Sequence, residues 1–187
     1  MTHMTIKETE LKGVYVITSL LRHDNRGSFK EVYRKDIFDS VGIKARFVQE
    51  NISSSKKGVI RGLHFQWDPP LGKLISVNIG RAFFAVVDIR RNSPTLGQWL
   101  SQELSDDNGL ELYVPPGFAS GFCAMSDRVD VHYKYTAFYN PAGESSIIWN
   151  DSKIGIVWPI QAPILSERDR AAGTLHDWLG RRESNLW

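Results

Sequence analysis

The 187-residue sequence has a single cysteine, almost no net charge and no long apolar run. Cys123 alone cannot form an intrachain disulfide, which fits a reducing compartment. The 23 Lys and Arg are scattered and balance 21 Asp and Glu to within +2, which excludes the basic stripe typical of nucleic-acid-binding proteins. The longest nearly uncharged apolar run, residues 82–87, is far shorter than the roughly 20 residues that cross a bilayer. We therefore expect no disulfide, no nucleic-acid partner and no membrane span.

The composition is that of one ordinary globular domain, with 42% hydrophobic and 24% charged residues. A chain of this length buries roughly 70% of its extended surface, enough for a core without disulfides or a structural metal. The first eight residues lack the basic start and the apolar middle of a secretory signal. We expect a single domain over residues 1–187 and a cytoplasmic location.

Short runs rich in Val, Ile, Phe, Tyr and Trp recur along the chain, separated by Gly, Pro, Asn and Asp, and this pattern predicts an all-β fold. The expected strands are 14–20, 28–33, 46–52, 59–65, 73–79, 82–89, 97–104, 110–114, 121–125, 129–138 and 145–149. So many strands in one domain must form two sheets or a closed barrel, so we expect a sandwich or jelly-roll barrel. Helices are expected only near 36–41 and after Ser166.

The hexamer Arg61-Gly-Leu-His-Phe-Gln66 places ionisable side chains in a strand that otherwise looks apolar. A glycine inside a strand often marks a bulge, and a bulge at Gly62 would let Arg61 and His64 reach the same cavity despite their odd spacing. His64 has two interpretations at this point: a hydrogen-bonded wall residue, which is the commoner case, or a catalytic group.

In residues 129–138, alternation predicts two faces of a strand. Val129, Val131, Tyr133 and Tyr135 lie on one face, and Asp130, His132 and Lys134 lie on the other. Tyr133 should therefore point into the barrel. An inward tyrosine is usually a core residue whose hydroxyl has found a partner, so a catalytic role is the less common alternative.

The segment Ser166-Glu-Arg-Asp169 matches a helix-capping pattern, which is the structural interpretation of Asp169. Arg26, Lys73 and Glu144 have ordinary surface interpretations. A barrel with histidines invites a metal site, but His64 is followed by Phe65-Gln66 and the other histidines are scattered. We therefore expect no metal, and no phosphate-loop or nucleophile-elbow motif is present.

Many separated motifs, in one order from about residue 7 to residue 170, resemble the dTDP-4-dehydrorhamnose 3,5-epimerase family. They are Arg26-Gly-Ser-Phe-Lys-Glu31, Phe47-Val-Gln-Glu-Asn51, Val59-Ile-Arg-Gly-Leu-His-Phe-Gln66, Gly72-Lys-Leu74, Val87-Asp-Ile-Arg90, Ser93-Pro-Thr95, Val114-Pro-Pro-Gly-Phe-Ala119, Tyr133-Lys134, Trp149-Asn-Asp151, Ile154-Gly-Ile156 and Trp158-Pro159. The resemblance implies a metal-free, cofactor-free cupin that dimerises with exchanged N-terminal strands. It also implies a reaction that inverts carbons 3 and 5 of a nucleotide-linked 4-keto-6-deoxyhexose, most simply a dTDP-sugar.

The same resemblance implies roles for individual residues. His64 corresponds to the catalytic base, Tyr133 to the proton donor and Asp169 to the acid that orients the histidine. Lys73 corresponds to the lysine beside the C4 keto oxygen, and Tyr139 to the aromatic residue that stacks on thymine. Further nucleotide-sugar contacts correspond to Arg26, Phe29, Glu31, Gln49, Asn51, Arg61, Ser120, Glu144 and Arg168.

Two departures from the family's pattern lie near the expected sugar pocket. Ser120 stands where the family has a substrate-contacting histidine in Gly-Phe-Ala-His-Gly-Phe. In Phe83-Phe-Ala-Val-Val-Asp-Ile-Arg90, where the family reads Phe-Asp-Val-Ala-Val-Asp-Ile-Arg, we expect Ala85 in place of an acid. The departures leave open a C3-only epimerase acting on a related sugar. A non-catalytic sugar-nucleotide binding module is the other alternative, and a metal-dependent cupin oxygenase is disfavoured by the ligand count.

Overall fold

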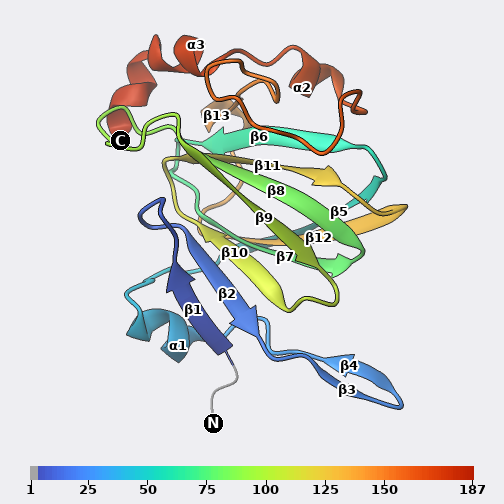
Figure 1. The fold of residues 1–187 in the computed structure, drawn as a ribbon. Coiled ribbons are helices and arrows are strands. Elements are labelled where there is room, and N and C mark those ends of the chain that lie inside the picture. Colours follow the sequence, from blue (N-terminus) through green and yellow to red (C-terminus); the bar gives the residue numbers. More distant parts are fainter. Residues whose placement is uncertain (1–3) are drawn as a thin grey trace.

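A computed structural model describes residues 4–187, so residues 1–3 of the predicted domain lie outside the described part. Two antiparallel sheets pack face to face (Figure 1). The larger sheet runs, edge to edge, β1 (Met4–Glu8), β2 (Tyr15–Ser19), β10 (Leu110–Val114), β7 (Lys73–Ile79), β12 (Arg128–Tyr135) and β5 (Gln49–Lys56). The smaller runs β13 (Glu144–Ser146), β6 (Ile60–Gln66), β11 (Phe118–Ala124), β8 (Arg81–Asp88) and β9 (Trp99–Ser105). The predicted all-β architecture is confirmed.

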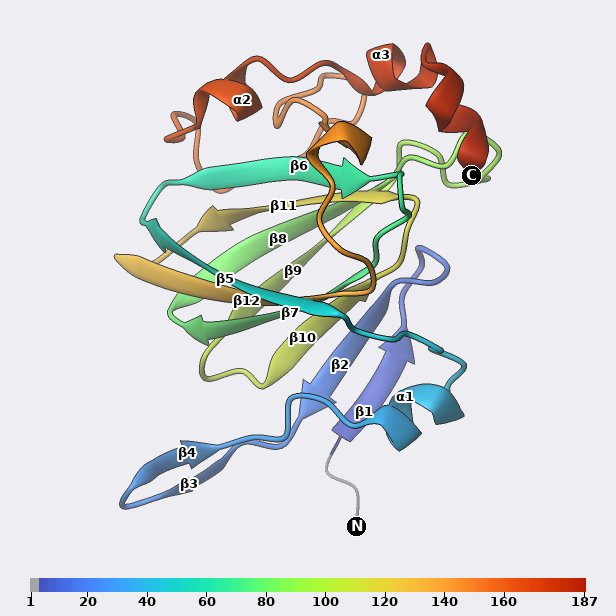
Figure 2. The same cartoon turned by 180° about the vertical axis from the view of Figure 1, so that it is seen from behind.

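The N-terminal region differs most from the sequence prediction. β1 was not predicted, because Met4 and Ile6 are its only apolar residues. The strand expected over 28–33 is wrong beyond Phe29: the chain instead forms a short hairpin, β3 (Arg22–Asp24) with β4 (Gly27–Phe29). This hairpin projects away from the two sheets (Figure 2). Its three-residue strands are exposed throughout, so burial gave no periodic signal in the sequence.

The helical segments are short and peripheral. α1 (Lys35–Ser40) matches the helix expected at 36–41. The predicted C-terminal helical stretch is broken into α2 (Glu167–Arg170), α3 (Leu175–Leu179) and the 3-10 turn η2 (Arg182–Leu186), and a further 3-10 turn, η1 (Pro141–Gly143), precedes β13. The C-terminal pieces lie over the outer face of the smaller sheet (Figure 1).

Three apolar clusters hold these layers together. One fills the space between the sheets and includes Phe84, Phe122, Val129 and Val131. The second lies between the smaller sheet and the C-terminal segment, and the third lies under α1 against the larger sheet. Every residue of β11 is buried because that strand is covered on both faces. The position of β11 explains why its sequence shows an apolar run rather than alternation.

The expected bulge in β6 is present at Gly62. Ser120 pairs with His64, and Phe122 pairs with Arg61, so three steps along β6 face two steps along β11. Gly62 has φ +123°, and a Cβ there would lie 2.6 Å from the Gly121 Cα and 2.8 Å from the Ser120 carbonyl oxygen. Only glycine fits both the backbone conformation and the space.

None of the helices between residues 4 and 187 is long and apolar enough to cross a membrane. The cytoplasmic location and the single-domain organisation stay predictions.

The bulge generates a stability prediction for Gly62→Ala. Gly27 has a similar φ of +131° but nothing within 4 Å of its virtual Cβ, so Gly27→Ala isolates the cost of the backbone conformation. Because Gly62→Ala adds a clash with backbone atoms, it should lower the free energy of unfolding by about 1–3 kcal/mol more than Gly27→Ala. Urea denaturation of both variants measures the difference, and equal losses would contradict the packing argument.

Candidate active site

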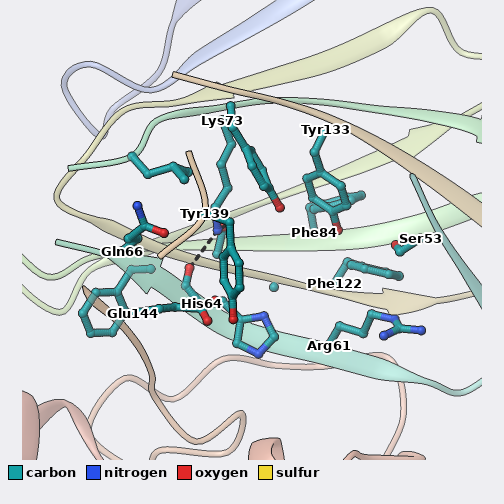
Figure 3. Close-up of a pocket in the computed structure, with 15 residues that line it drawn as sticks. Ser53, Arg61, His64, Gln66, Lys73, Phe84, Phe122, Tyr133, Tyr139 and Glu144 are labelled. Atoms are coloured by element: carbon teal, nitrogen blue, oxygen red, sulfur yellow. Dashed lines mark hydrogen bonds between the residues drawn. The ribbon is translucent and has the colours of Figure 1, made fainter. Parts of the chain in front are cut away.

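A cavity of about 190 Å³ opens between the two sheets (Figure 3). Its walls are formed by Ser53, Arg61, His64, Phe65, Gln66, Leu71, Lys73, Phe84, Ser120, Gly121, Phe122, Tyr133, Tyr135, Tyr139 and Glu144. Seven of the residues that the sequence singled out are therefore brought together: Arg61, His64, Lys73, Ser120, Tyr133, Tyr139 and Glu144.

His64 is held by a buried acid from a distant part of the chain. Its Nε2 lies 2.5 Å from Oδ1 of Asp169, a residue of α2 that is 3% exposed. Burial raises the pKa of the Asp169 carboxyl, but hydrogen bonds from His64 and Ser166 outweigh burial and leave it below its ordinary value. Asp169 is therefore an anion at neutral pH, next to the imidazole.

The helix cap expected in the segment Ser166–Asp169 is also present, and it uses the backbone of Asp169 rather than its carboxylate. The Ser166 hydroxyl accepts a hydrogen bond from the Asp169 backbone N–H at 3.1 Å and so caps α2. The carboxylate of Asp169, in contrast, turns toward His64. The same short segment therefore caps α2 with the Ser166 hydroxyl and orients His64 with the Asp169 carboxylate.

Lys73 is buried in the wall of the cavity, which excludes the alternative interpretation as an ordinary surface lysine. It begins β7, a central strand of the larger sheet, and is 9% exposed. Its Nζ donates hydrogen bonds to the His64 carbonyl oxygen at 2.9 Å and to the Ser120 hydroxyl at 3.1 Å. Burial lowers the pKa of the Lys73 ammonium from 10.5 to about 8, so it stays charged at neutral pH but titrates near it.

Tyr133 faces the cavity from the sheet opposite His64 (Figure 3). It packs against the core between the sheets, whereas His132 turns outward to Glu50, with Nε2 3.0 Å from Oε2. The alternation expected along β12 is confirmed. Burial raises the pKa of the Tyr133 phenol above its ordinary value, so the hydroxyl keeps its proton at neutral pH.

An ion pair lies beside Tyr139 at the rim of the cavity. The Arg168 guanidinium approaches the Glu144 carboxylate at 2.8 Å, with the arginine side chain half-exposed and the glutamate side chain largely buried. A hydrogen bond to Glu144 raises the pKa of Tyr139. Gln49 accepts the backbone N–H of Tyr139 at 2.9 Å and donates to the Asn51 side chain at 3.2 Å. The rim thus joins β5, β13, α2 and the segment that follows β12.

The structure does not bring Arg26, Phe29 and Glu31 to the cavity of this chain. They lie on or beside the projecting hairpin (Figures 1 and 2). Phe29 is 70% exposed, and the Arg26 guanidinium pairs with the Asp24 carboxylate of the same hairpin at 2.6 Å.

The expectation for Ala85 is wrong. Ala85 is fully buried in the cluster on the other side of β8, whereas its neighbour Phe84 lines the cavity and stacks on Phe122 with ring centroids 5.2 Å apart. Counting back along the motif from Asp88 also puts the family's aspartate at Phe84. The missed signal was the alternation of β8, which sends successive side chains to opposite faces.

Two further cavity residues, Tyr135 and Gln66, were not predicted to be site residues, although the alternation along β12 places Tyr135 on the inward face. Tyr135 follows Tyr133 by two positions and so shares its face, with ring centroids 5.9 Å apart. Gln66 donates to the carbonyl oxygens of Pro69 and Phe138 at 2.9 and 3.1 Å, which fixes the loop beside the cavity. Over residues 4–187, no group of three or more His, Cys, Asp or Glu side chains is arranged to hold a metal ion.

The burial of Lys73 generates a titration prediction. In protein labelled with ¹³C-lysine, the Cε resonance of Lys73 should titrate near pH 8, because the ammonium loses its proton as the pH rises through its lowered pKa. The variant Lys73→Met assigns the resonance. Titration of the same resonance near 10.5 would show that the ammonium is as well solvated as a surface lysine.

Residues 8–177 match the protein family described as dTDP-4-dehydrorhamnose 3,5-epimerase. The dTDP-4-dehydrorhamnose 3,5-epimerase of Methanothermobacter thermautotrophicus is 43% identical over 183 residues, 96% of each chain. The crystal structure of the Legionella pneumophila dTDP-6-deoxy-D-glucose-3,5-epimerase in complex with dTDP-4-keto-L-rhamnose is 41% identical with a TM-score of 0.89, covering 93% of this chain and 94% of that one. A dTDP-4-dehydrorhamnose 3-epimerase of Streptomyces niveus is 37% identical over 171 residues, 90% of this chain and 83% of its own. These similarities confirm the predicted cupin fold, and the chain belongs to the dTDP-4-dehydrorhamnose 3,5-epimerase family.

Proposed function

We propose that this chain inverts carbons 3 and 5 of a dTDP-linked 4-keto-6-deoxyhexose, converting dTDP-4-dehydro-6-deoxy-D-glucose to dTDP-4-dehydro-L-rhamnose. The observation that carries the proposal is the placement of the His64–Asp169 pair and Tyr133 on opposite walls of one cavity, with the Lys73 ammonium in the same cavity. Membership of the family supports the reaction type.

The first step is removal of a proton next to the ketone by His64. Asp169 accepts a hydrogen bond from Nε2, which leaves Nδ1 as the unprotonated nitrogen that takes the proton. The resulting enolate carries negative charge on the C4 oxygen, and the Lys73 ammonium stabilises this charge inside a buried site. Asp169 stabilises the imidazolium that forms.

The second step returns a proton to the opposite face of the planar enolate. Tyr133 is suited to this step because its phenol is protonated at neutral pH and lies across the cavity from His64. An acid and a base on opposite faces together produce inversion rather than simple exchange. A binding module has no need of such a pair, which favours the enzyme over that alternative.

The remaining residues are proposed to bind the nucleotide. Arg61, Arg168 and Glu144 lie around the cavity, Gln49 and Asn51 join its rim, and half-exposed Tyr139 is placed to stack on a thymine base. Guanidinium groups suit the diphosphate because their planar fork matches two phosphate oxygens.

We also propose a homodimer in which the hairpin of one copy completes the site of the other. Arg26, Phe29 and Glu31 lie outside the cavity of their own chain, on an arm that projects from the barrel, and β1 is an edge strand with room to pair. In a dimer with exchanged N-terminal strands, these side chains would reach the nucleotide held by the second copy.

The alternative reaction is inversion at carbon 3 alone. It is supported by the similarity to the Streptomyces niveus 3-epimerase and by two cavity positions, Phe84 and Ser120, that depart from the family's pattern. Both reactions use the same base and the same ammonium, so only the product separates them.

Incubation with dTDP-4-dehydro-6-deoxy-D-glucose in deuterated water, followed by NMR of the sugar, tests the proposed function. We expect deuterium and inversion at both carbons. His64→Asn should reduce exchange at both carbons by ~10²–10⁴ while nucleotide binding persists, because only the base is lost. Label at carbon 3 alone would identify the 3-epimerase, and no exchange by the wild-type protein would rule out both reactions.

The variant Tyr133→Phe tests the second proton transfer. It keeps the ring that packs against the core and removes only the hydroxyl. Deprotonation by His64 should survive, and the enolate should be reprotonated from the face of the histidine, so deuterium should enter without inversion. The measurement is the ratio of exchange to inversion, and a ratio equal to that of the wild type would remove Tyr133 from the mechanism.

A further inference from the structure

Ser120 contacts the charged end of Lys73. An ammonium has three N–H donors, and in the described chain the Nζ of Lys73 uses two of them, on the His64 carbonyl oxygen at 2.9 Å and on the Ser120 hydroxyl at 3.1 Å. One donor is left for a ligand in the cavity. Ser120 is 6% exposed, so water does not readily replace its contact with the ammonium.

The strand pairing makes this contact rigid. Ser120 lies on β11 directly opposite His64 on β6, and Lys73 reaches both from the other sheet. The same ammonium is therefore tied to the backbone of the proposed base and to the strand beside it. Two fixed acceptors determine the direction of the third N–H.

Within residues 4–187, no carboxylate helps to hold the Lys73 ammonium in place, because Lys73 forms no ion pair there. The inner wall, where the family's pattern has an acid, presents Phe84 stacked on Phe122. The titratable and charged groups that surround the cavity are Arg61, His64, Tyr133, Tyr135, Tyr139, Glu144 and Arg168. Among them, Glu144 favours the charged lysine and Arg168 disfavours it, and the two are paired with each other.

We propose that Ser120 is a positioning residue, which holds the Lys73 ammonium so that its remaining N–H points to the keto oxygen of the substrate. This inference rests on the proposed function, and it gives Ser120 a role different from the substrate contact that its position in the family implies. A hydroxyl suits the task because it accepts a hydrogen bond from the ammonium and, unlike an imidazole, adds no titrating group beside it.

The test compares Ser120→Ala, which removes the acceptor, with Ser120→Thr, which keeps a hydroxyl. In Ser120→Ala, kcat should fall about tenfold or more with KM within threefold of the wild type, because a hydrogen bond to a charged group is lost. The lowered pKa of Lys73, about 8, predicts an alkaline limb of the wild-type kcat profile near that pH, and in Ser120→Ala this limb should move down by about one pH unit. Ser120→Thr should restore both. Ser101→Ala, at an exposed position on β9 of the same sheet and outside the cavity, should keep the wild-type limb.

A rise in KM with unchanged kcat and an unmoved limb would overturn the inference and make Ser120 a substrate contact. The Cε titration of Lys73 in the ligand-free protein provides an independent readout. It should move to lower pH in Ser120→Ala and return in Ser120→Thr, and an unmoved titration in Ser120→Ala would also overturn the inference. Because that measurement uses no substrate, it separates a failure of this inference from a failure of the proposed reaction.

Discussion

The site depends on the close approach of Gly62 and Gly121, where β6 and β11 lie so near each other that neither backbone has room for a side chain. A Cβ on Gly121 would lie 2.7 Å from the Arg61 carbonyl oxygen, as close as the clash that a Cβ on Gly62 would make. The approach absorbs the extra residue of β6, so Arg61 and His64 both turn inward. It also presents the His64 carbonyl to Lys73. A two-residue packing constraint thereby places the base and orients the cation.

The charges of the site are arranged for a reaction that creates two new ones. Asp169 contacts the imidazole, while the Lys73 ammonium donates to the His64 carbonyl oxygen in the wall of the cavity. Moving a proton from sugar to His64 makes an imidazolium beside a carboxylate and an enolate beside an ammonium. Each charge forms next to its opposite, and the phenol of Tyr133 stays neutral until it donates. Preorganisation of this kind needs no rearrangement during the reaction.

Much of the barrel and its inner wall could be predicted because the signals are local. The alternation along β12 orients Tyr133, and the glycine in β6 marks the bulge beside His64. The partner of His64 could not be derived from local pattern, since Asp169 is 105 residues away and its segment predicts a helix cap equally well. The burial of Lys73 could not be derived from local pattern either, because it depends on the sheet that packs opposite β7; only the family resemblance placed this lysine in the site. The family's aspartate was aligned with Ala85 although it corresponds to Phe84. In a strand, a shift of one position moves a side chain to the opposite face of the sheet.

Asp169 also has a consequence for the order in which the protein becomes competent. The last strand around the cavity, β13, ends at Ser146, so every strand of the barrel is synthesised before the acid of the pair. The later segment is hydrogen-bonded to the start of β6, where the Ile164 carbonyl accepts from the Ile60 N–H, and to the residues after β13, where the Gly173 carbonyl accepts from the Ile148 N–H. Its aromatic residue Trp178 then packs against Phe65, with centroids 4.6 Å apart. The strands that line the cavity are thus synthesised first, and the acid–base pair is complete only when the C-terminal segment packs against β6 and brings Asp169 to His64.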